Sequence, residues 1–544
     1  MAALTFMRHS SALSLTLVAS FLVLSTILPI HVEASSGDLD SGFGVGGKVI
    51  THVGFGDRVE TLAIQRDGKI IAAGQSGSRG IYDADDFALA RYNTDGNLDQ
   101  AFGSGGIVRT DFFGDEDHIS SIALQSDGKI VAVGQARSGA GIYFGVVRYN
   151  TDGSPDGTFG AGGKLITSFA GYGDNAHAVV IQPDGKILVG GSAQVISKTI
   201  PGELTFGFAL ARYNQDGSLD TEFGERGKVI SELDGICTRL ALQPDGKVIA
   251  GGTITTRETN SDFALARYNA DGSLDAAFGN DGKVTTDFNK WADILSALAL
   301  QADGKIVVAG DVDPPDPLHN DSQPCVARYN PDGSLDSTFG NRGTVIDGNF
   351  TAARAIALQD NGKIIVAGLG SNQKGDGDFA LARYMANGNV DTSFGNGGMI
   401  TTNFLGNDDA FALALLPDGR IVAAGATYGP EFRSGFALAR YNNADDRFDL
   451  HLQGENNSCL LRLNSTTGEY LFTDCDSGFT LAGKGTLRLR RCKINLEDSG
   501  ADFSLSVKVK SCALTAKISL EILSQSKTFV IRDSDITDAL APCS

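Results

Sequence analysis

The chain repeats one pattern of about 58 residues seven times, and this repetition limits the possible folds more than any other feature. Three short sequence words mark the repeat: Asp-Gly-Lys or a close variant, ALARYN or a close variant, and Phe-Gly. Each word occurs seven times, and the three words keep the same order. Words that stay in register over seven copies indicate a repeat architecture. The first word, Asp-Gly-Lys or a close variant, begins at Asp67, Asp127, Asp184, Asp245, Asp303, Asn361 and Asp418.

Each repeat predicts four short β-strands. In residues 61–113 the segments TLAIQ, KIIAAG, FALARYN and GGIVRTDF have the alternation or the buried composition of strands. The Asp-Gly pairs between them tolerate the positive φ of a tight turn. Four short strands per unit at a fixed period are typical of a β-propeller blade. The sequence therefore predicts an all-β, seven-bladed β-propeller of four-stranded blades over residues 35–442.

The two ends of the array predict how the ring closes. The chain enters with residues 37–53, which correspond to the last quarter of a repeat, and it leaves after the third quarter at residue 442. We therefore expect residues 47–53 to supply the outer strand of a blade whose other strands come from about 409–442. Such closure by the N- and C-terminal segments leaves no free sheet edge.

The words ALQ-DGK-I, FALARYN-DGSLD and FG-GK resemble the delta-60 repeat family of bacterial exported proteins. The resemblance covers about 400 residues in seven copies. It implies a β-propeller outside the cytoplasm, in secreted or surface proteins. It implies no catalytic residues that could be transferred to this chain.

Residues 1–34 have the pattern of a secretory signal peptide. Arg8 and His9 precede an apolar run over residues 11–30, and small residues around Val32 and Ala34 predict cleavage after Ala34. The alternative is an uncleaved membrane anchor, since the run is long enough to span a bilayer. With cleavage, we expect a secreted or cell-surface protein with no membrane span in the mature chain.

Residues 447–544 lack the repeat words and predict a second, small β-sandwich-like or barrel domain. Their segments alternate strongly in hydropathy, and LRLNSTTGEYLFTDC with SGFTLAGKG resembles a tail domain of exported bacterial proteins that has no assigned activity. Five of the seven cysteines lie here, which in an exported protein favours disulfides over zinc ligands. The favoured pairs, among several possible, are Cys459 with Cys475 and Cys492 with Cys512. Cys237 and Cys325 are predicted to be buried thiols.

The connections on one face of the predicted propeller vary in length, whereas those on the other barely change. Between the second and third strands the count runs from 9 to 16 residues. Loops that vary over a rigid repeated scaffold are common binding surfaces. This face is therefore the predicted binding face.

Five repeats carry an aspartate ten residues before their Asp-Gly-Lys turn, at the expected mouth of the central channel on this face. A ring of like charges favours a bound cation, a basic peptide or hydration. Alternatively, each carboxylate caps its own loop by accepting backbone hydrogen bonds. The candidate ligand-binding residues are Asp57, Asp117, Asp174, Asp293 and Asp408.

Two further patterns have structural alternatives. The segment from Asn93 to Asp99 and its copies resemble short calcium loops, but turn formation by Asp and Asn explains the same residues. The arginine of each ALARYN word is predicted to pair with the aspartate of the following Leu-Asp, as Arg91 with Asp99. Beyond possible calcium, no cofactor or metal site is expected.

Charge and motifs narrow the function. The net charge of −20 argues against nucleic-acid binding, which requires a basic surface. No HExxH zinc motif and no GxSxG nucleophile motif in a strand–turn–helix context is present. We expect a secreted or cell-surface binding scaffold that uses the variable loops. Its partner would be an extracellular protein, peptide or carbohydrate. The alternative is a secreted propeller hydrolase or lyase with its site at the channel mouth.

Overall fold

The computed structural model describes residues 36–443, with gaps at 78–83, 140, 170, 172, 198–201, 257–259, 289–291, 313–321, 349, 372–376, 405 and 430–433. It also describes the backbone of the strands between residues 447 and 531. Within these ranges, no helix has the length and hydropathy required to cross a membrane. The predicted signal peptide, residues 1–34, lies outside the described residues, so this assignment stays a prediction.

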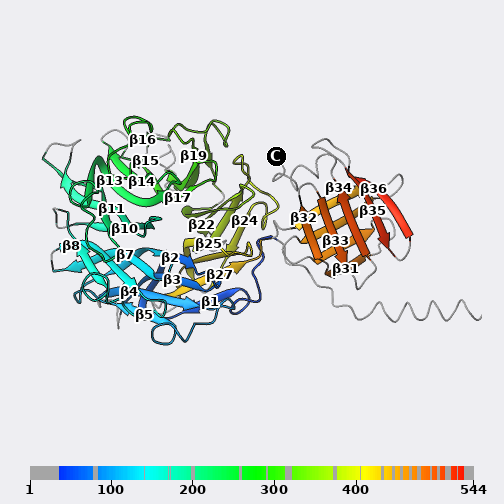
Figure 1. The fold of residues 1–544 in the computed structure, drawn as a ribbon, viewed down its shortest axis with the longest axis horizontal. Helices are drawn as coiled ribbons and strands as arrows, with labels where there is room; N and C mark the ends of the chain where they lie inside the picture. The colour runs from blue at the N-terminus through cyan, green and yellow to red at the C-terminus, as the bar shows by residue number, and fades with distance from the viewer. Residues whose placement is uncertain are drawn as a thin grey trace, which may run out of the picture. The chain divides into compact units, whose positions relative to one another are not determined.

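Residues 36–443 form an all-β propeller whose sheets surround a common centre (Figure 1). Four antiparallel sheets follow the predicted strand order of one repeat. They are β2 (Phe55–Ile64), β3 (Ile70–Gly77), β4 (Asp85–Tyr92) and β5 (Ile107–Thr110); β6 (His118–Leu124), β7 (Ile130–Ser138), β8 (Gly141–Tyr149) and β9 (Lys164–Thr167); β17 (Asp293–Leu300), β18 (Ile306–Val312), β19 (Gln323–Tyr329) and β20 (Thr344–Ile346); and β21 (Ala352–Leu358), β22 (Ile364–Ser371), β23 (Gly377–Tyr384) and β24 (Met399–Thr402).

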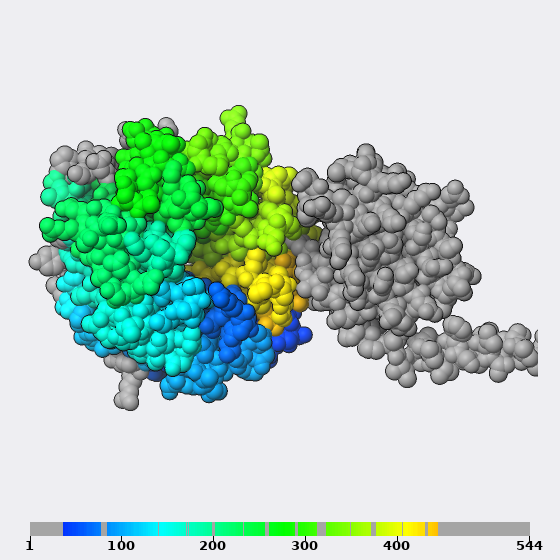
Figure 2. Space-filling view, viewed as in Figure 1, coloured from blue at the N-terminus to red at the C-terminus, as the bar shows by residue number. Residues whose placement is uncertain are grey.

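A fifth four-stranded sheet closes the ring as predicted. It consists of β25 (Asn407–Leu415), β26 (Ile421–Tyr428), β27 (Ser434–Tyr441) and, from the other end of the array, β1 (Lys48–Thr51). Strand β1 is antiparallel to β27, with Lys48 opposite Ala439 and Thr51 opposite Phe436. Figure 2 shows the blue N-terminal residues beside the yellow residues of the last repeat.

The expectation of seven four-stranded blades is wrong: the strand pairing gives five separate four-stranded blades. The remaining strands of the ring form one seven-stranded sheet, in which β13 takes part in the pairing of two consecutive repeats. Its strands are β10 (Asn175–Ile181), β11 (Ile187–Ile196), β12 (Leu204–Tyr213), β13 (Lys228–Leu242), β14 (Val248–Thr256), β15 (Asn260–Tyr268) and β16 (Lys283–Thr286).

The link between the two fused repeats is short. Asp245 lies 22 positions after Phe223, whereas Asp127 lies 25 positions after Phe102. Asp234 pairs with β12 and the next residue, Gly235, pairs with β14, so no residue remains for a loop. Link length alone does not decide the fusion, because the other link of 22 positions, from Phe339 to Asn361, leaves β20 and β21 separate.

The second and third strands of each repeat form the core. Residues such as Ile70, Ala72, Ala88 and Ala90 are fully buried and pack against the sheet of the neighbouring repeat. A strand that is covered on both faces needs apolar residues in succession, which the words KIIAAG and FALARY supply. Cys237 and Cys325 are buried free thiols, as predicted.

The predicted pairing of the repeated arginine and aspartate is confirmed. Arg91 Nε donates to Asp99 at 2.8 Å, and the guanidinium lies 4.4 Å from the centre of the Phe102 ring. The same arginine donates to the carbonyl of Thr151 in the next repeat, so the pair links neighbouring repeats. The equivalent pairs, all at 2.6–2.8 Å, are Arg148–Asp156, Arg212–Asp220, Arg267–Asp275, Arg328–Asp336, Arg383–Asp391 and Arg440–Asp40.

The strands described after residue 446 belong to one nine-stranded antiparallel sheet, and the expected sandwich-like or barrel shape of this domain stays a prediction. In sheet order they are β31 (Thr480–Lys484), β30 (Glu469–Asp474), β29 (Ser458–Asn464), β28 (Arg447–Gln453), β36 (Gln525–Ile531), β35 (Ala516–Ile522), β34 (Phe503–Lys508), β33 (Lys493–Asp498) and β32 (Thr486–Arg490). The side chains of Cys459, Cys475, Cys492 and Cys512 lie outside the described part, and their pairing stays a prediction.

Candidate functional site

The innermost strand of every repeat contains a β-bulge at the same place. In β2, Val59 and Thr61 pair with consecutive residues of β3, so Glu60 between them is left out of the ladder. The same shift occurs in β6, β10, β13, β17, β21 and β25. A bulge redirects the side chain that it leaves out. The seven bulge residues are Glu60, Ser120, His177, Thr238, Ser296, Arg354 and Phe411.

A glycine on the second strand makes each bulge possible. A Cβ atom on Gly191 would lie 1.9 Å from the carbonyl oxygen of Asn175 on the neighbouring inner strand. Only a residue without a side chain allows this approach. The equivalent glycines show the same distance within 0.1 Å, and they are Gly74, Gly134, Gly252, Gly310, Gly368 and Gly425.

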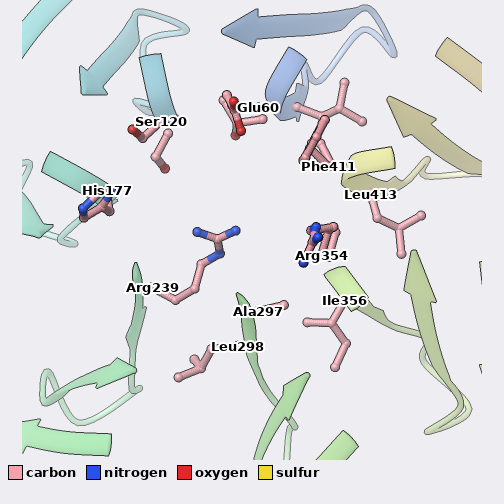
Figure 3. A pocket seen from close by; sticks show the side chains of 15 residues that line it. Glu60, Ser120, His177, Arg239, Ala297, Leu298, Arg354, Ile356, Phe411 and Leu413 are labelled. Carbon is pink, nitrogen blue, oxygen red and sulfur yellow. The ribbon is translucent and has the colours of Figure 1, made fainter. Parts of the chain in front are cut away.

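The inner strands surround a pocket of about 180 Å³ in the central channel (Figure 3). The strands are neighbours in the order β2, β6, β10, β13, β17, β21, β25 and back to β2. Figure 3 shows Arg239 and Arg354 reaching toward the middle of the opening, with Glu60, Ser120 and His177 around it. Apolar residues complete the lining, among them Leu298, Ile356, Phe411 and Leu413.

Two of the channel arginines are paired with carboxylates. Arg58 contacts Glu60 and lies 4.6 Å from the centre of the Phe411 ring. Burial raises the pKa of Glu60, and Arg58 opposes this shift. Arg354 Nη1 lies 2.7 Å from Asp311, and its Nε lies 3.9 Å from Asp409. These charges therefore neutralise each other within the protein.

Arg239 differs from both. Its Nη1 donates to the carbonyl of Thr238 at 2.8 Å, and burial lowers its pKa. Burial and the charge of Arg239 also lower the pKa of His177 to about 4, so this imidazole is neutral at pH 7. The Ser192 hydroxyl lies 3.5 Å from His177 Nε2. The pocket thus combines a guanidinium, a neutral imidazole and the hydroxyls of Ser120 and Ser121.

The five predicted ring aspartates cap loops, and none of them lines this pocket. Asp57 accepts hydrogen bonds from the amides of Val53 and Gly54, and Asp117 accepts from Phe112 and Arg137. These contacts are those expected from the capping interpretation, and a ligand-binding role for the five stays a prediction. Asp174, Asp293 and Asp408 accept in the same way from Phe169, Phe288 and Phe404, and all five side chains are at most 1% exposed.

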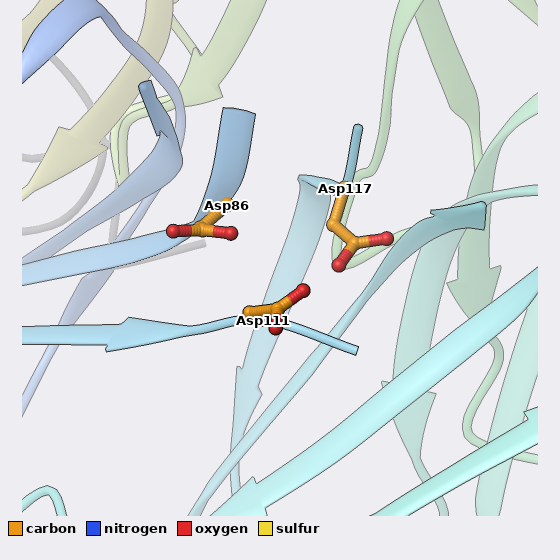
Figure 4. A group of neighbouring side chains, drawn as sticks. All are labelled: Asp86, Asp111 and Asp117. Carbon is orange, nitrogen blue, oxygen red and sulfur yellow. The ribbon is translucent and has the colours of Figure 1, made fainter. Parts of the chain in front are cut away.

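Two equivalent groups of aspartates could hold a metal ion. Asp86, Asp111 and Asp117 bring carboxylate oxygens within 4.8 Å of one another (Figure 4). Asp262, Asp287 and Asp293 form the same arrangement three repeats later. Oxygen ligands of this kind suit Ca²⁺. In the first group Arg109 lies 2.8 Å from Asp86, so a protein cation already shares that carboxylate.

The segments that resemble calcium loops form turns in the described residues. Asp95 accepts a hydrogen bond from the amide of Asn97 at 3.0 Å, and Asp152 accepts from Ser154 at 2.9 Å. These bonds within the turn are the expected alternative to calcium ligation. Calcium binding by these segments stays a prediction.

The channel site was missed because no motif marks it. His177 belongs to no catalytic motif, and Arg239 was not predicted as a site residue. Aligning the repeats on Asp-Gly-Lys would reveal the site, because all seven bulge residues lie seven positions before the first residue of that word. At this position the repeats carry acidic, basic, hydroxyl, imidazole and aromatic side chains.

Comparison with known proteins supports a propeller repeat. Residues 65–102, 125–159, 182–223, 243–278, 301–339 and 359–394 match the family described as "Domain of unknown function (DUF5122) beta-propeller". No curated protein matches the chain.

Solved structures that are similar include a protein of unknown function from Dyadobacter fermentans, with 13% identity, TM-score 0.38, and coverage of 61% of this chain and 97% of the other. Virginiamycin B lyase from Staphylococcus aureus has 10% identity, TM-score 0.39, and coverage of 72% and 99%. Polysaccharide lyase Uly1 has 10% identity, TM-score 0.42, and coverage of 77% and 94%. Similarities at this level do not extend to activity.

Proposed function

We propose that this chain, whose repeats match a β-propeller family model, is a binding protein that takes up a ligand in its central channel. One observation carries the proposal: the bulge residues differ in chemistry although the strands around them repeat. Phe411, Arg354 and Glu60 occupy equivalent positions on equivalent strands. A propeller whose inner strands served only to close the ring would not require different side chains at this position.

The pocket has the features of a ligand site. It is concave, it combines polar and apolar side chains, and several of its polar groups converge on its centre (Figure 3). Its volume is below the roughly 300–1,000 Å³ typical of sites for drug-sized ligands, which favours a smaller compound. The variable connections of the binding face would act beside it, selecting what reaches the channel.

The proposed protein acts outside the cytoplasm, secreted or displayed at the cell surface. The signal pattern at residues 1–34 supports this location. Protein exported from a bacterial host should begin at Ser35, and N-terminal sequencing that finds residues 1–34 retained would contradict cleavage.

A thermal-shift screen tests the proposed binding. The probes are amino acids, monosaccharides and small organic acids, each added alone to the full chain. We expect at least one to raise the melting temperature in a saturable way, because a ligand of the native state stabilises it by mass action.

A filled channel provides the specificity test. Ser120→Phe places a ring in the pocket and should abolish the response, whereas Ser104→Phe, at an exposed position outside the pocket, should keep it. If no probe raises the melting temperature, or if the Ser120→Phe protein still responds, the channel is not a binding site.

A further inference from the structure

One arginine in the channel breaks the repeat pattern. Arg239 lies six positions before its Asp-Gly-Lys turn. Alanine at this place is compatible with the fold in four repeats, so folding alone does not require a guanidinium here. The residues of the other repeats are all small: Thr61, Ser121, Ala178, Ala297, Ala355 and Ala412.

The guanidinium of Arg239 is not neutralised by a neighbouring carboxylate. In the part of the chain that the structure describes, its one hydrogen bond is to the carbonyl of Thr238, and no carboxylate lies within 4.0 Å. Burial lowers the pKa of Arg239 and the charge of Glu60 opposes this shift, but Glu60 already forms an ion pair with Arg58. Because a guanidinium has five N–H donors, Arg239 can hold a further acceptor.

The rest of the pocket fits a compact organic anion. The hydroxyls of Ser120 and Ser121 and the neutral imidazole of His177 offer hydrogen bonds, while Leu298 and Phe411 offer apolar contact. A charge removed from water is costly unless it is paired. A ligand that supplies one negative charge would remove this cost at Arg239.

We infer that the channel binds a small compound with one carboxylate group, which pairs with the guanidinium of Arg239. A carboxylate matches the planar fork of arginine in two parallel hydrogen bonds. A phosphate dianion would bring a second charge, and among the described residues that line the pocket the other arginine, Arg354, is already paired with Asp311. This inference rests on the proposed binding function and specifies its ligand class.

Matched acids and amides test the inference on the full chain. The probes are butyrate, lactate and glucuronate, the amides butyramide, lactamide and glucuronamide, and inorganic phosphate, all at constant ionic strength. We expect at least one acid to raise the melting temperature while its amide does not. Phosphate should have a smaller effect than that acid.

Variants of Arg239 test whether this residue binds the acid. Arg239→Ala reproduces the residue of four other repeats, so it should melt at the wild-type temperature or above and bind the acid at least tenfold more weakly. Arg239→Lys should keep part of the affinity, because it keeps the charge and loses the fork. Arg66→Gln, at an exposed turn outside the channel, should bind as the wild type does.

The remaining outcomes overturn the inference. It fails if acid and amide act equally, if none of the three acids acts, if phosphate acts more strongly, or if Arg239→Ala binds as tightly as the wild type. A large drop in the melting temperature of Arg239→Ala without ligand would show a structural role instead. Binding of a neutral sugar that Ser120→Phe blocks would leave the proposed function intact while excluding the carboxylate.

Discussion

Aspartates at different positions of the repeat have opposite electrostatic roles. Asp391 is paired with Arg383 and Lys363, which together with the Ser393 hydrogen bond lower its pKa to about 2 against the opposing effect of burial. Asp117 is buried beside Asp111 and Asp86, and burial first, then these like charges, raises its pKa to about 6. Residue type alone therefore does not predict the charge state. The sequence predicted the Arg–Asp pairs because both partners repeat, but the burial of Asp117 depends on how its loop folds over it.

The raised pKa of Asp117 predicts a pH-dependent contribution to stability. Its carboxyl binds a proton more tightly in the folded chain than in the unfolded chain, so the stabilisation is complete below about pH 4 and is lost as the pH rises through about 6. In Asp117→Asn, this contribution, up to about 3 kcal/mol, disappears. Urea unfolding at pH 4.5 and pH 7 should therefore show a smaller pH effect in the variant than in the wild type.

Asp391→Asn is the matched control for this measurement. Its pKa of about 2 lies below the window, and so does the ordinary value of 3.8, so the carboxyl is ionised in both states from pH 4.5 to 7. The variant should lose a constant amount of stability across that range. An equal pH effect in wild type and Asp117→Asn would refute the assignment to Asp117.

At the level of strands, the sequence identified the elements but not the bulges. The words KIIAAG and FALARYN predict strands by themselves, since composition and turn residues are local signals. A bulge is a property of two paired strands. In β10, for example, Ala176 and Ala178 pair with consecutive residues of β11, and His177 between them has no partner in the ladder. The glycine in each second strand, such as Gly191 in β11, was visible in the sequence, but the reason for it is the close approach of the inner strand.

The close approach predicts a large effect for Gly191→Ala. Its Cβ would lie 1.9 Å from the carbonyl oxygen of Asn175, and the backbone on both sides leaves no flexible side chain to move away. The bulge must then rearrange, which should destabilise the protein by about 3 kcal/mol or more. Differential scanning calorimetry measures this, with Gly157→Ala as the control, since nothing lies within 4 Å of its added methyl group. Equal melting temperatures for the two variants would show that the glycine is not required.

For the whole molecule, the sequence predicted ring closure correctly and the number of separate blades wrongly. Closure was visible because a split repeat leaves a last quarter at one end and three quarters at the other. The fusion of two repeats through β13 occurs at Gly235, which stands where five repeats have the loop-capping aspartate. The missing aspartate alone does not cause the fusion, because Thr351 takes the same position in another repeat, where β20 and β21 stay separate. The fusion becomes visible only in the structure, where β13 pairs with both β12 and β14.

Ring closure predicts that a disulfide across the junction of β1 and β27 stabilises the molecule unusually well. Val49 faces Leu438 there, as Val108 faces Leu89 within the first repeat. The pair Val49→Cys and Leu438→Cys closes a loop of about 390 residues, and the control pair Leu89→Cys and Val108→Cys closes about 20. Loop-closure entropy then favours the former by roughly 2–3 kcal/mol. The melting temperature of each variant, compared between its oxidised and reduced forms, gives the stabilisation by each disulfide. Both variants replace one valine and one leucine, so the loss of these side chains affects both comparisons equally. Equal gains would contradict this prediction, because the cross-link is expected to constrain the unfolded chain according to the number of residues that it encloses.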